Sequence, residues 1–176
     1  IDNFIPMGTG TSSAKHVAVV DAAICACLLY QCDDADERRG FARGLGVSST
    51  SHLLIPINNR ESNTGVCSHW SLLYVDVGRN VVVHLDSMSG NNSAAAEATA
   101  RAIEDMCSDL TTNATFTLFE APNVPQQSNG FDCGVYTILF ARHIHEHLTG
   151  LCAHPSAVED FDSPFFADMR TRITPH

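Results

Sequence analysis

The chain has 176 residues, of which 44% are hydrophobic and 17% charged, so it can build the core of one compact domain and is not disordered over most of its length. Its net charge of -10 and its pI of about 5.1 argue against nucleic acid and against an anionic membrane surface as partners. We therefore expect a single monomeric domain over residues 1–176, with no nucleic-acid and no membrane partner.

The cysteines indicate a reducing environment. There are seven of them, an odd number, with no C-x-x-C pair, and several lie inside apolar runs. Free cysteines in such positions serve as small hydrophobic side chains in the core, which is typical of intracellular proteins. No signal-peptide pattern, lipidation motif or membrane-length apolar stretch is present, so we expect a cytoplasmic or nuclear protein, or one found in both places.

The first third of the chain predicts four segments. Residues 1–16 are rich in Gly, Thr and Ser and predict an irregular segment. The apolar run at residues 17–31 favours, by its length, a buried helix. The charged residues 32–40 predict a loop, and the apolar residues 53–57 predict a buried strand.

Two β-rich runs follow, at residues 70–77 and 81–86. The residues between them, Gly78, Arg79 and Asn80, are typical of a tight turn, so the two runs predict an antiparallel hairpin. A hairpin brings the start of its first strand beside the end of its second strand.

The rest of the chain alternates helix and strand. Residues 93–110 have a helical hydrophobic period, with Ser93 placed to cap the N-terminus. A strand at 115–119, a helix at 133–148 and a short helix near 161–173 complete the expected elements. This order predicts an α+β domain with a small mixed β-sheet flanked by helices.

Cys133 is the first candidate for chemistry, because it lies where a Gly-containing loop meets a predicted helix. A helix N-terminus carries partial positive charge and free N–H groups, and both stabilise the nucleophilic thiolate. Gly134 allows a substrate backbone to approach closely. Gln126 and Gln127, just before the cysteine, could supply a side-chain donor to an oxyanion. Taken singly, an inert buried cysteine and a polar loop are the commoner explanations.

The predicted hairpin also places an imidazole beside a carboxylate. His69 precedes the first strand and Asp86 ends the second, so the two residues fall within about two positions of direct pairing at the open end. A carboxylate in this place fixes the tautomer of the imidazole and supports its charged form. The spacing therefore indicates a His–Asp pair, although Asp86 alone would more often be a strand-end cap and His69 alone a surface residue.

Three segments together resemble a known family: PQQSNGFDCGVY at 125–136, HWSLL at 69–73 and LDS at 85–87. They are similar to the ubiquitin-like-protease family of cysteine peptidases, which act on sentrin/SUMO-type and Nedd-type modifiers. The order His, Asp, Gln, Cys is the same. The resemblance implies a papain-like, adenain-like protease fold that uses no metal and no cofactor.

The resemblance also implies roles for individual residues. In the family the histidine is the base, the aspartate orients it, the cysteine attacks, and a glutamine completes the oxyanion hole. These catalytic roles would fall to His69, Asp86, Cys133 and Gln127. The tryptophan after the histidine, Trp70, would pack against the Gly-Gly tail of the modifier.

The deneddylase branch of the family is the most similar. Residues 41–58 align with it without gaps, and the connection from Asn58 to His69 has its length. The implied partner is a Nedd-type modifier and its conjugates, with a SUMO-type modifier as the alternative. The family's W-L-x-D motif reads AVVD here, which keeps Asp21 as a binding residue but has Ala18 in place of the tryptophan.

Three functions fit these observations: a peptidase that cleaves after the Gly-Gly of a modifier, a silent modifier-binding module, and an acetyltransferase of the same clan. The filled catalytic positions favour the peptidase, and only the missing tryptophan favours the silent module. His143 and His147 have a spacing that can bind zinc, but a polar helix face is far more common, so we expect no metal site.

Overall fold

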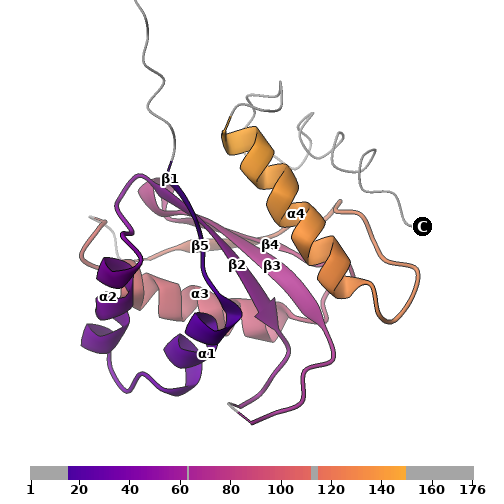
Figure 1. Ribbon diagram of the computed structural model, residues 1–176, viewed down its shortest axis with the longest axis horizontal. Helices are drawn as coiled ribbons and strands as arrows, with labels where there is room; N and C mark the ends of the chain where they lie inside the picture. The colour runs from indigo at the N-terminus through magenta and orange to yellow at the C-terminus, as the bar shows by residue number, and fades with distance from the viewer. Residues whose placement is uncertain (1–15, 63, 112–114, 150–176) are drawn as a thin grey trace, which may run out of the picture.

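The structure, a computed structural model, describes residues 16–62, 64–111 and 115–149. Five strands of the described residues form one mixed sheet in which they lie in chain order (Figure 1). The outer pairs are parallel and the central pairs antiparallel. The strands are β1 (His16–Val19), β2 (Ser51–Asn58), β3 (Trp70–Asp76), β4 (Val81–Leu85) and β5 (Thr117–Glu120).

Helices cover both faces of this sheet. One face carries α1 (Ala22–Tyr30), α2 (Ala35–Gly44) and α3 (Ser93–Cys107), and the other carries α4 (Cys133–Leu148) (Figure 1). Alternate residues of the central strands therefore enter two separate cores. On β3, for example, Leu73 packs toward α1–α3 and Leu72 toward α4. Burial on both faces explains why the strands are continuous apolar runs rather than alternating ones.

The predicted hairpin is present as β3 and β4. Leu72 pairs with Leu85 and Asp76 with Val81, and a short 3₁₀ turn, Val77–Arg79, joins the strands. Asn80 closes the turn in the left-handed region, at a φ of 54°. Gly78 is required there, because a Cβ at this position would lie 2.6 Å from the backbone oxygen of Ser49.

The prediction of one buried helix over residues 17–31 was wrong in its first part. Residues 16–19 form β1, parallel to β2, and the helix begins only at Ala22. The side chain of Asp21 caps this helix by accepting a hydrogen bond of 2.7 Å from the Ala23 N–H. A uniformly apolar run carries no periodicity that would reveal the change from strand to helix.

The prediction of a loop over residues 32–40 was also wrong, because α2 begins at Ala35. Asp34 caps it by accepting a hydrogen bond from the Glu37 N–H. Arg38 then binds the Leu28 carbonyl oxygen and the Asp105 carboxylate, which ties α2 to α1 and α3. These long-range contacts stabilise a helix whose composition alone indicates a charged loop.

Smaller differences concern element ends. Asn92, not Ser93, is the N-cap residue of α3, and its side chain turns toward the sheet instead of capping the helix. The helix α4 has the predicted bounds. The expected irregular N-terminal segment before residue 16 and the expected helix near 161–173 lie outside the described residues. Within the described ranges, no helix is both long and apolar enough to cross a membrane.

Candidate active site

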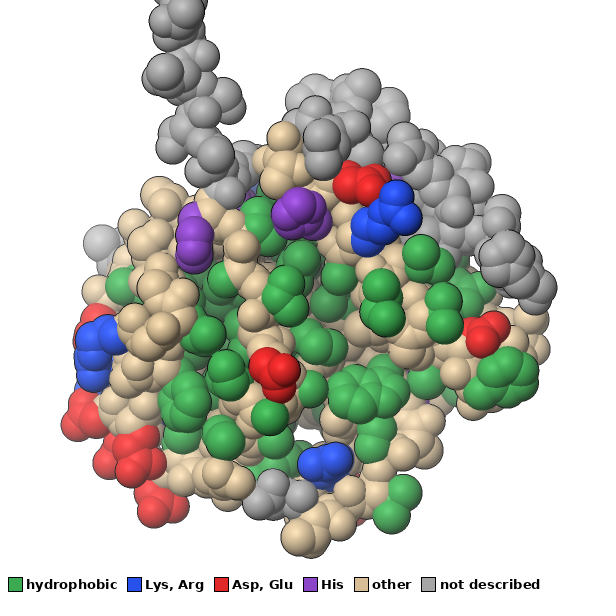
Figure 2. Space-filling view, in the orientation of Figure 1, with side chains coloured by type: hydrophobic (Ala, Val, Ile, Leu, Met, Phe, Trp, Pro, Cys, Tyr) green, Lys and Arg blue, Asp and Glu red, His purple; other side chains and the backbone are tan. Residues whose placement is uncertain are grey.

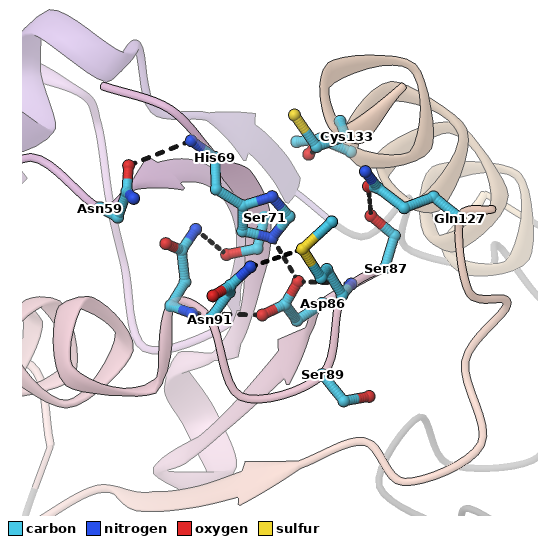
Figure 3. Close-up of polar contacts among 12 residues, drawn as sticks. Asn59, His69, Ser71, Asp86, Ser87, Ser89, Asn91, Gln127 and Cys133 are labelled. Carbon is cyan, nitrogen blue, oxygen red and sulfur yellow. Dashed lines mark hydrogen bonds and ion pairs between the residues drawn. The ribbon is translucent and has the colours of Figure 1, made fainter. Parts of the chain in front are cut away.

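Three chain segments meet at one end of the sheet. They are the start of β3, the turn that follows β4, and the loop that leads into α4 (Figure 3). The first contributes His69, the second Asp86, and the third Gln127 and Cys133. The structure therefore brings together all four residues that the sequence singled out for catalysis.

The hairpin register explains the His69–Asp86 contact. Because Leu72 pairs with Leu85, the continued ladder places Asp86 opposite Ser71, two residues from His69 on the same face. The His69 Nε2 lies 2.6 Å from the Asp86 Oδ1, and each residue is only 3% exposed. With Nε2 engaged by the carboxylate, Nδ1 is the ring nitrogen left for proton transfer.

The Asp86 carboxylate is buried, so it needs hydrogen-bond donors. The Met88 N–H donates to its Oδ1 at 2.9 Å, and the Asn92 N–H donates to its Oδ2 at 3.2 Å. Asn92 is also the N-cap residue of α3, so the carboxylate faces the positive end of that helix. These contacts fix the orientation of the carboxylate, which in turn orients the imidazole.

Cys133 is the first residue of α4. The Tyr136 N–H bonds to the Asp132 carbonyl oxygen, so the N–H groups of residues 133–135 precede the first helical hydrogen bond and are available to a substrate oxygen. A Cβ added at Gly134 would meet no atom within 4 Å, which leaves open space beside the thiol. The site thus combines a thiol, the positive end of a helix and free backbone donors.

Other cysteines have surroundings that oppose thiolate formation. Burial raises the pKa of Cys107 to about 12, and burial also raises the pKa of Cys25. Among the six described cysteines, only Cys133 begins a helix. The helix terminus therefore distinguishes Cys133 from the thiols that pack in the core; Cys152 lies outside the described residues.

Two glutamines fasten the loop before Cys133 to the turn after Asp86. The Oε1 of Gln127 accepts a hydrogen bond of 2.7 Å from the Ser87 hydroxyl, and its Nε2 donates to the Asn129 carbonyl oxygen. The Nε2 of Gln126 donates to the Asp86 carbonyl oxygen at 2.9 Å. Because an amide nitrogen carries two hydrogens, the bond to Asn129 leaves a second hydrogen on the Gln127 Nε2.

Two residues that support the site, Asn59 and Ser87, were not predicted from the sequence. Asn59 accepts hydrogen bonds from the backbone N–H groups of Ser68 and His69, and its own N–H donates to the His69 carbonyl oxygen. Ser87 anchors Gln127. The only signal in the sequence is a polar residue just beyond a strand end, which is too common to identify either residue.

The three predicted binding residues have different surroundings. Trp70 is half-buried beside His69 and opens β3 opposite Asn58. Gly134 borders the thiol, whereas the Asp21 carboxylate is engaged as the cap of α1. In the described part of the chain, no three His, Cys, Asp or Glu side chains gather as metal ligands, and His143 is buried within α4.

An apolar groove runs beside the site, between β1 and α4. Figure 2 shows hydrophobic side chains gathered on this face. The groove has a volume of about 350 Å³, and Val19 on β1 and Ile138 on α4 stand exposed at its edges, at 66% and 69%. Leu54, Pro56 and Leu72 line it from the sheet. Apolar surface of this kind is typical of a site for another protein.

Comparison with known proteins identifies the family. Residues 31–168 match the model of the Ulp1 protease family, C-terminal catalytic domain. The chain belongs to this family. It is therefore a cysteine peptidase of the ubiquitin-like-protease type, as the sequence predicted.

Curated relatives include proteases for two kinds of modifier. The chain is 27% identical to NEDD8-specific protease 1 of Arabidopsis thaliana over 176 residues, which covers 98% of this chain and 73% of the relative. It is 30% identical to human Sentrin-specific protease 8 over 98 residues, or 56% of this chain and 45% of the relative. With human Sentrin-specific protease 2 it shares 27% identity, covering 59% of this chain but only 18% of the relative.

Solved structures confirm the predicted protease fold. The SUMO protease Ulp1 with its catalytic cysteine oxidised to a sulfonic acid matches with a TM-score of 0.60 and 21% identity, covering 90% of this chain and 66% of that one. The Xanthomonas campestris effector XopD bound to ubiquitin matches with a TM-score of 0.57 and 21% identity, covering 96% and 76%. At this identity the likeness concerns the fold alone.

Proposed function

We propose that this Ulp1-family chain cleaves after the C-terminal Gly-Gly of a Nedd-type modifier, both in precursors and in conjugates. The observation that carries the chemistry is the His69–Asp86 contact of 2.6 Å at the same end of the sheet as the N-terminus of α4, where Cys133 lies. A base, its orienting carboxylate and a thiol at a positive helix end are the components that thiol-mediated acyl transfer requires.

In the proposed acylation step, the Cys133 thiolate attacks the carbonyl carbon of the terminal glycine. The carbonyl oxygen becomes an oxyanion, which accepts hydrogen bonds from the Cys133 N–H and the Gln127 side chain. His69, which takes the thiol proton through Nδ1, returns it to the leaving amine. The C–N bond breaks, and the modifier remains attached to Cys133 as a thioester.

In the proposed deacylation step, His69 removes a proton from a water molecule that attacks the thioester. The second oxyanion occupies the same donors, and the C–S bond breaks with return of the proton to sulfur. Asp86 remains ionised throughout, since its part is to orient His69 and stabilise the imidazolium. No step requires a metal or a cofactor.

The modifier is the finer part of the proposal. A Nedd-type modifier is supported because the relative that spans 98% of this chain is a NEDD8-specific protease. A SUMO-type modifier is the second candidate, supported by the similarity to Sentrin-specific protease 2. The exposed apolar groove between β1 and α4 supports a protein substrate in either case, and Trp70, next to His69, is proposed to contact the modifier tail.

A silent binding module is the remaining alternative, because Ala18 replaces a family tryptophan. In the structure Ala18 packs into the α1–α3 core, whereas the next residue, Val19, edges the groove. Filled positions at His69, Asp86 and Cys133 favour turnover over binding alone. We further propose that the protein acts in the cytoplasm or nucleus, which is supported by the six free thiols of the described chain.

Labelling with two modifiers that carry a C-terminal electrophile tests the proposal. We expect the Nedd-type probe to label the wild-type protein at Cys133 and the SUMO-type probe to label it much more slowly. The Cys133→Ala variant should bind the modifier without labelling, and Cys27→Ala, which removes a thiol from α1, is the matched control. Labelling by the SUMO-type probe alone would overturn the modifier assignment, and labelling by neither would overturn the peptidase.

A further inference from the structure

A second histidine–carboxylate pair, in which the histidine is buried, lies behind the proposed catalytic pair. His84 on β4 is fully buried, and its Nδ1 lies 2.7 Å from the Oε2 of Glu120 on β5. Its Nε2 lies 2.9 Å from the hydroxyl of Ser71 on β3. Polar groups inside an apolar sheet are costly unless each is hydrogen-bonded, and the mechanism above uses none of these three.

The sheet register places the three side chains in one row. Glu120 is the direct partner of His84 in the parallel β4–β5 ladder. Across β3 the partner of His84 is Leu73, so Ser71 is its diagonal neighbour on the same face. This is the face that α3 covers, and α3 begins at the end of the row.

The row continues to the proposed catalytic pair through Asn92. The Nδ2 of Asn92 donates to the Ser71 hydroxyl oxygen at 2.8 Å. The backbone N–H of Asn92 donates to the Asp86 Oδ2, and the Asp86 Oδ1 binds His69. A continuous chain of hydrogen-bonded groups therefore runs through Glu120, His84, Ser71, Asn92, Asp86 and His69.

The two ends of this chain have a fixed direction. A carboxylate oxygen only accepts, so the Nδ1 of His84 carries a hydrogen and donates it to the half-exposed Glu120 carboxylate. At the other end the Asn92 amide presents its nitrogen to Ser71, and the same Ser71 hydroxyl forms the hydrogen bond with the Nε2 of His84.

We propose that His84 and Ser71 are positioning residues for the His69–Asp86 pair. They hold the Asn92 side chain, and Asn92 in turn supplies the backbone N–H that fixes the Asp86 Oδ2. Without that donor the Met88 N–H still holds the Asp86 Oδ1, but the Oδ2 loses its partner and the carboxylate is less firmly oriented toward the His69 Nε2. The inference rests on the proposed function, because that proposal gives His69 and Asp86 their catalytic roles.

Two substitutions at His84 separate its two contacts. A glutamine amide reaches the position of Nε2 and keeps the bond to Ser71, whereas an asparagine amide reaches only the position of Nδ1 and loses it. We expect His84→Asn and Ser71→Ala to lower kcat about ten- to a hundred-fold with little change in KM. His84→Gln should keep most of the wild-type kcat.

His52→Asn is the matched control. His52 is another buried histidine of the same sheet, but it bonds to Tyr74 and pairs with Asp76 at the opposite end of the strands. We expect this variant to lose stability and to keep the wild-type kcat. Equal kcat in His84→Asn and His84→Gln, or an equal loss in His52→Asn, would overturn the positioning role.

A second measurement needs no modifier. Alkylation of Cys133 by iodoacetamide at about pH 6, followed by peptide mass spectrometry, reports the thiolate that His69 supports. We expect slower alkylation in His84→Asn than in His84→Gln, and equal rates would contradict the inference. If the wild-type protein hydrolyses no modifier, the proposed function fails, while the alkylation rates still decide whether His84 positions the pair.

Discussion

At the scale of single residues, the site depends on side chains that were inconspicuous in the sequence. His69, Asp86, Gln127 and Cys133 could be selected because their spacing and their resemblance to a family agreed. His84 could not be selected in this way, because a histidine inside an apolar strand indicates no function until its neighbours in space are known. Its hydrogen-bond partners come from β3 and β5, and Glu120 is 36 residues away in the chain.

Glu120 gives the outer end of the hydrogen-bonded chain a pH dependence. Burial alone would raise the pKa of this carboxyl, but the hydrogen bond and charge interaction with His84, together with a hydrogen bond from Ser93, hold the pKa below its usual value. The charged carboxylate therefore stabilises the fold above the pKa of an unfolded glutamate, about 4.3, and the stabilisation is lost as the pH falls through the lower folded value.

We expect the Glu120→Gln variant to be less stable than the wild-type protein at neutral pH, with a difference that shrinks as the pH falls below about 4.3. Denaturant unfolding followed by circular dichroism across this range measures the difference. Glu97→Gln, at an exposed position of α3, is the control and should show almost none of it. A difference that grows on acidification would contradict the assigned direction.

At the scale of elements, the sequence predicted those helices and strands whose bounds depend on local sequence patterns. The β3–β4 hairpin has a strong turn signal, and α4 follows a clear loop, so both have nearly the expected bounds. The helix α2 was missed because Arg38 stabilises it through contacts with α1 and α3. The strand β1 was missed because its partner residues on β2 are 35 positions further along the chain, so no local pattern reveals the pairing.

Two glycines in these elements predict opposite effects of the same change. In Gly78→Ala, the new Cβ would lie 2.6 Å from the Ser49 backbone oxygen, so we expect the free energy of unfolding to fall by about 1–3 kcal/mol. In Gly40→Ala, within α2, the nearest atom lies at 4.0 Å, so a gain of about 0.5–1 kcal/mol is expected. Urea denaturation measures the free energy of unfolding of both variants. A change of the same sign in Gly78→Ala and Gly40→Ala would contradict the prediction.

At the scale of the whole molecule, the sheet separates two hydrophobic cores. Ile103 belongs to the core under α3, and Phe140 belongs to the core under α4; both are completely buried. The proposed catalytic site draws on both layers, because Asp86 is held by the start of α3 while Cys133 begins α4. Assembly of the site therefore requires both cores to be formed.

Because the two cores lie on opposite faces, their mutations should act independently. We expect Ile103→Val to cost about 0.5–1.5 kcal/mol and Phe140→Leu to cost a similar amount, with the double variant equal to the sum within about 0.5 kcal/mol. Thermal and denaturant unfolding of the four proteins of this cycle give the values. A coupling well above that margin would show that the sheet transmits packing changes between its faces.

The order of the elements along the chain has a consequence for biosynthesis. A ribosome completes the segment that contains His69, Asp86 and Asn92 well before it makes Cys133. Gln126 and Gln127, whose side chains bond to the turn after β4, are made only a few residues before the thiol. The imidazole and the carboxylate are therefore synthesised before the nucleophile that would act with them. Peptidase activity would begin only when α4 docks on the sheet, so translation itself delays the moment at which the protein becomes a protease.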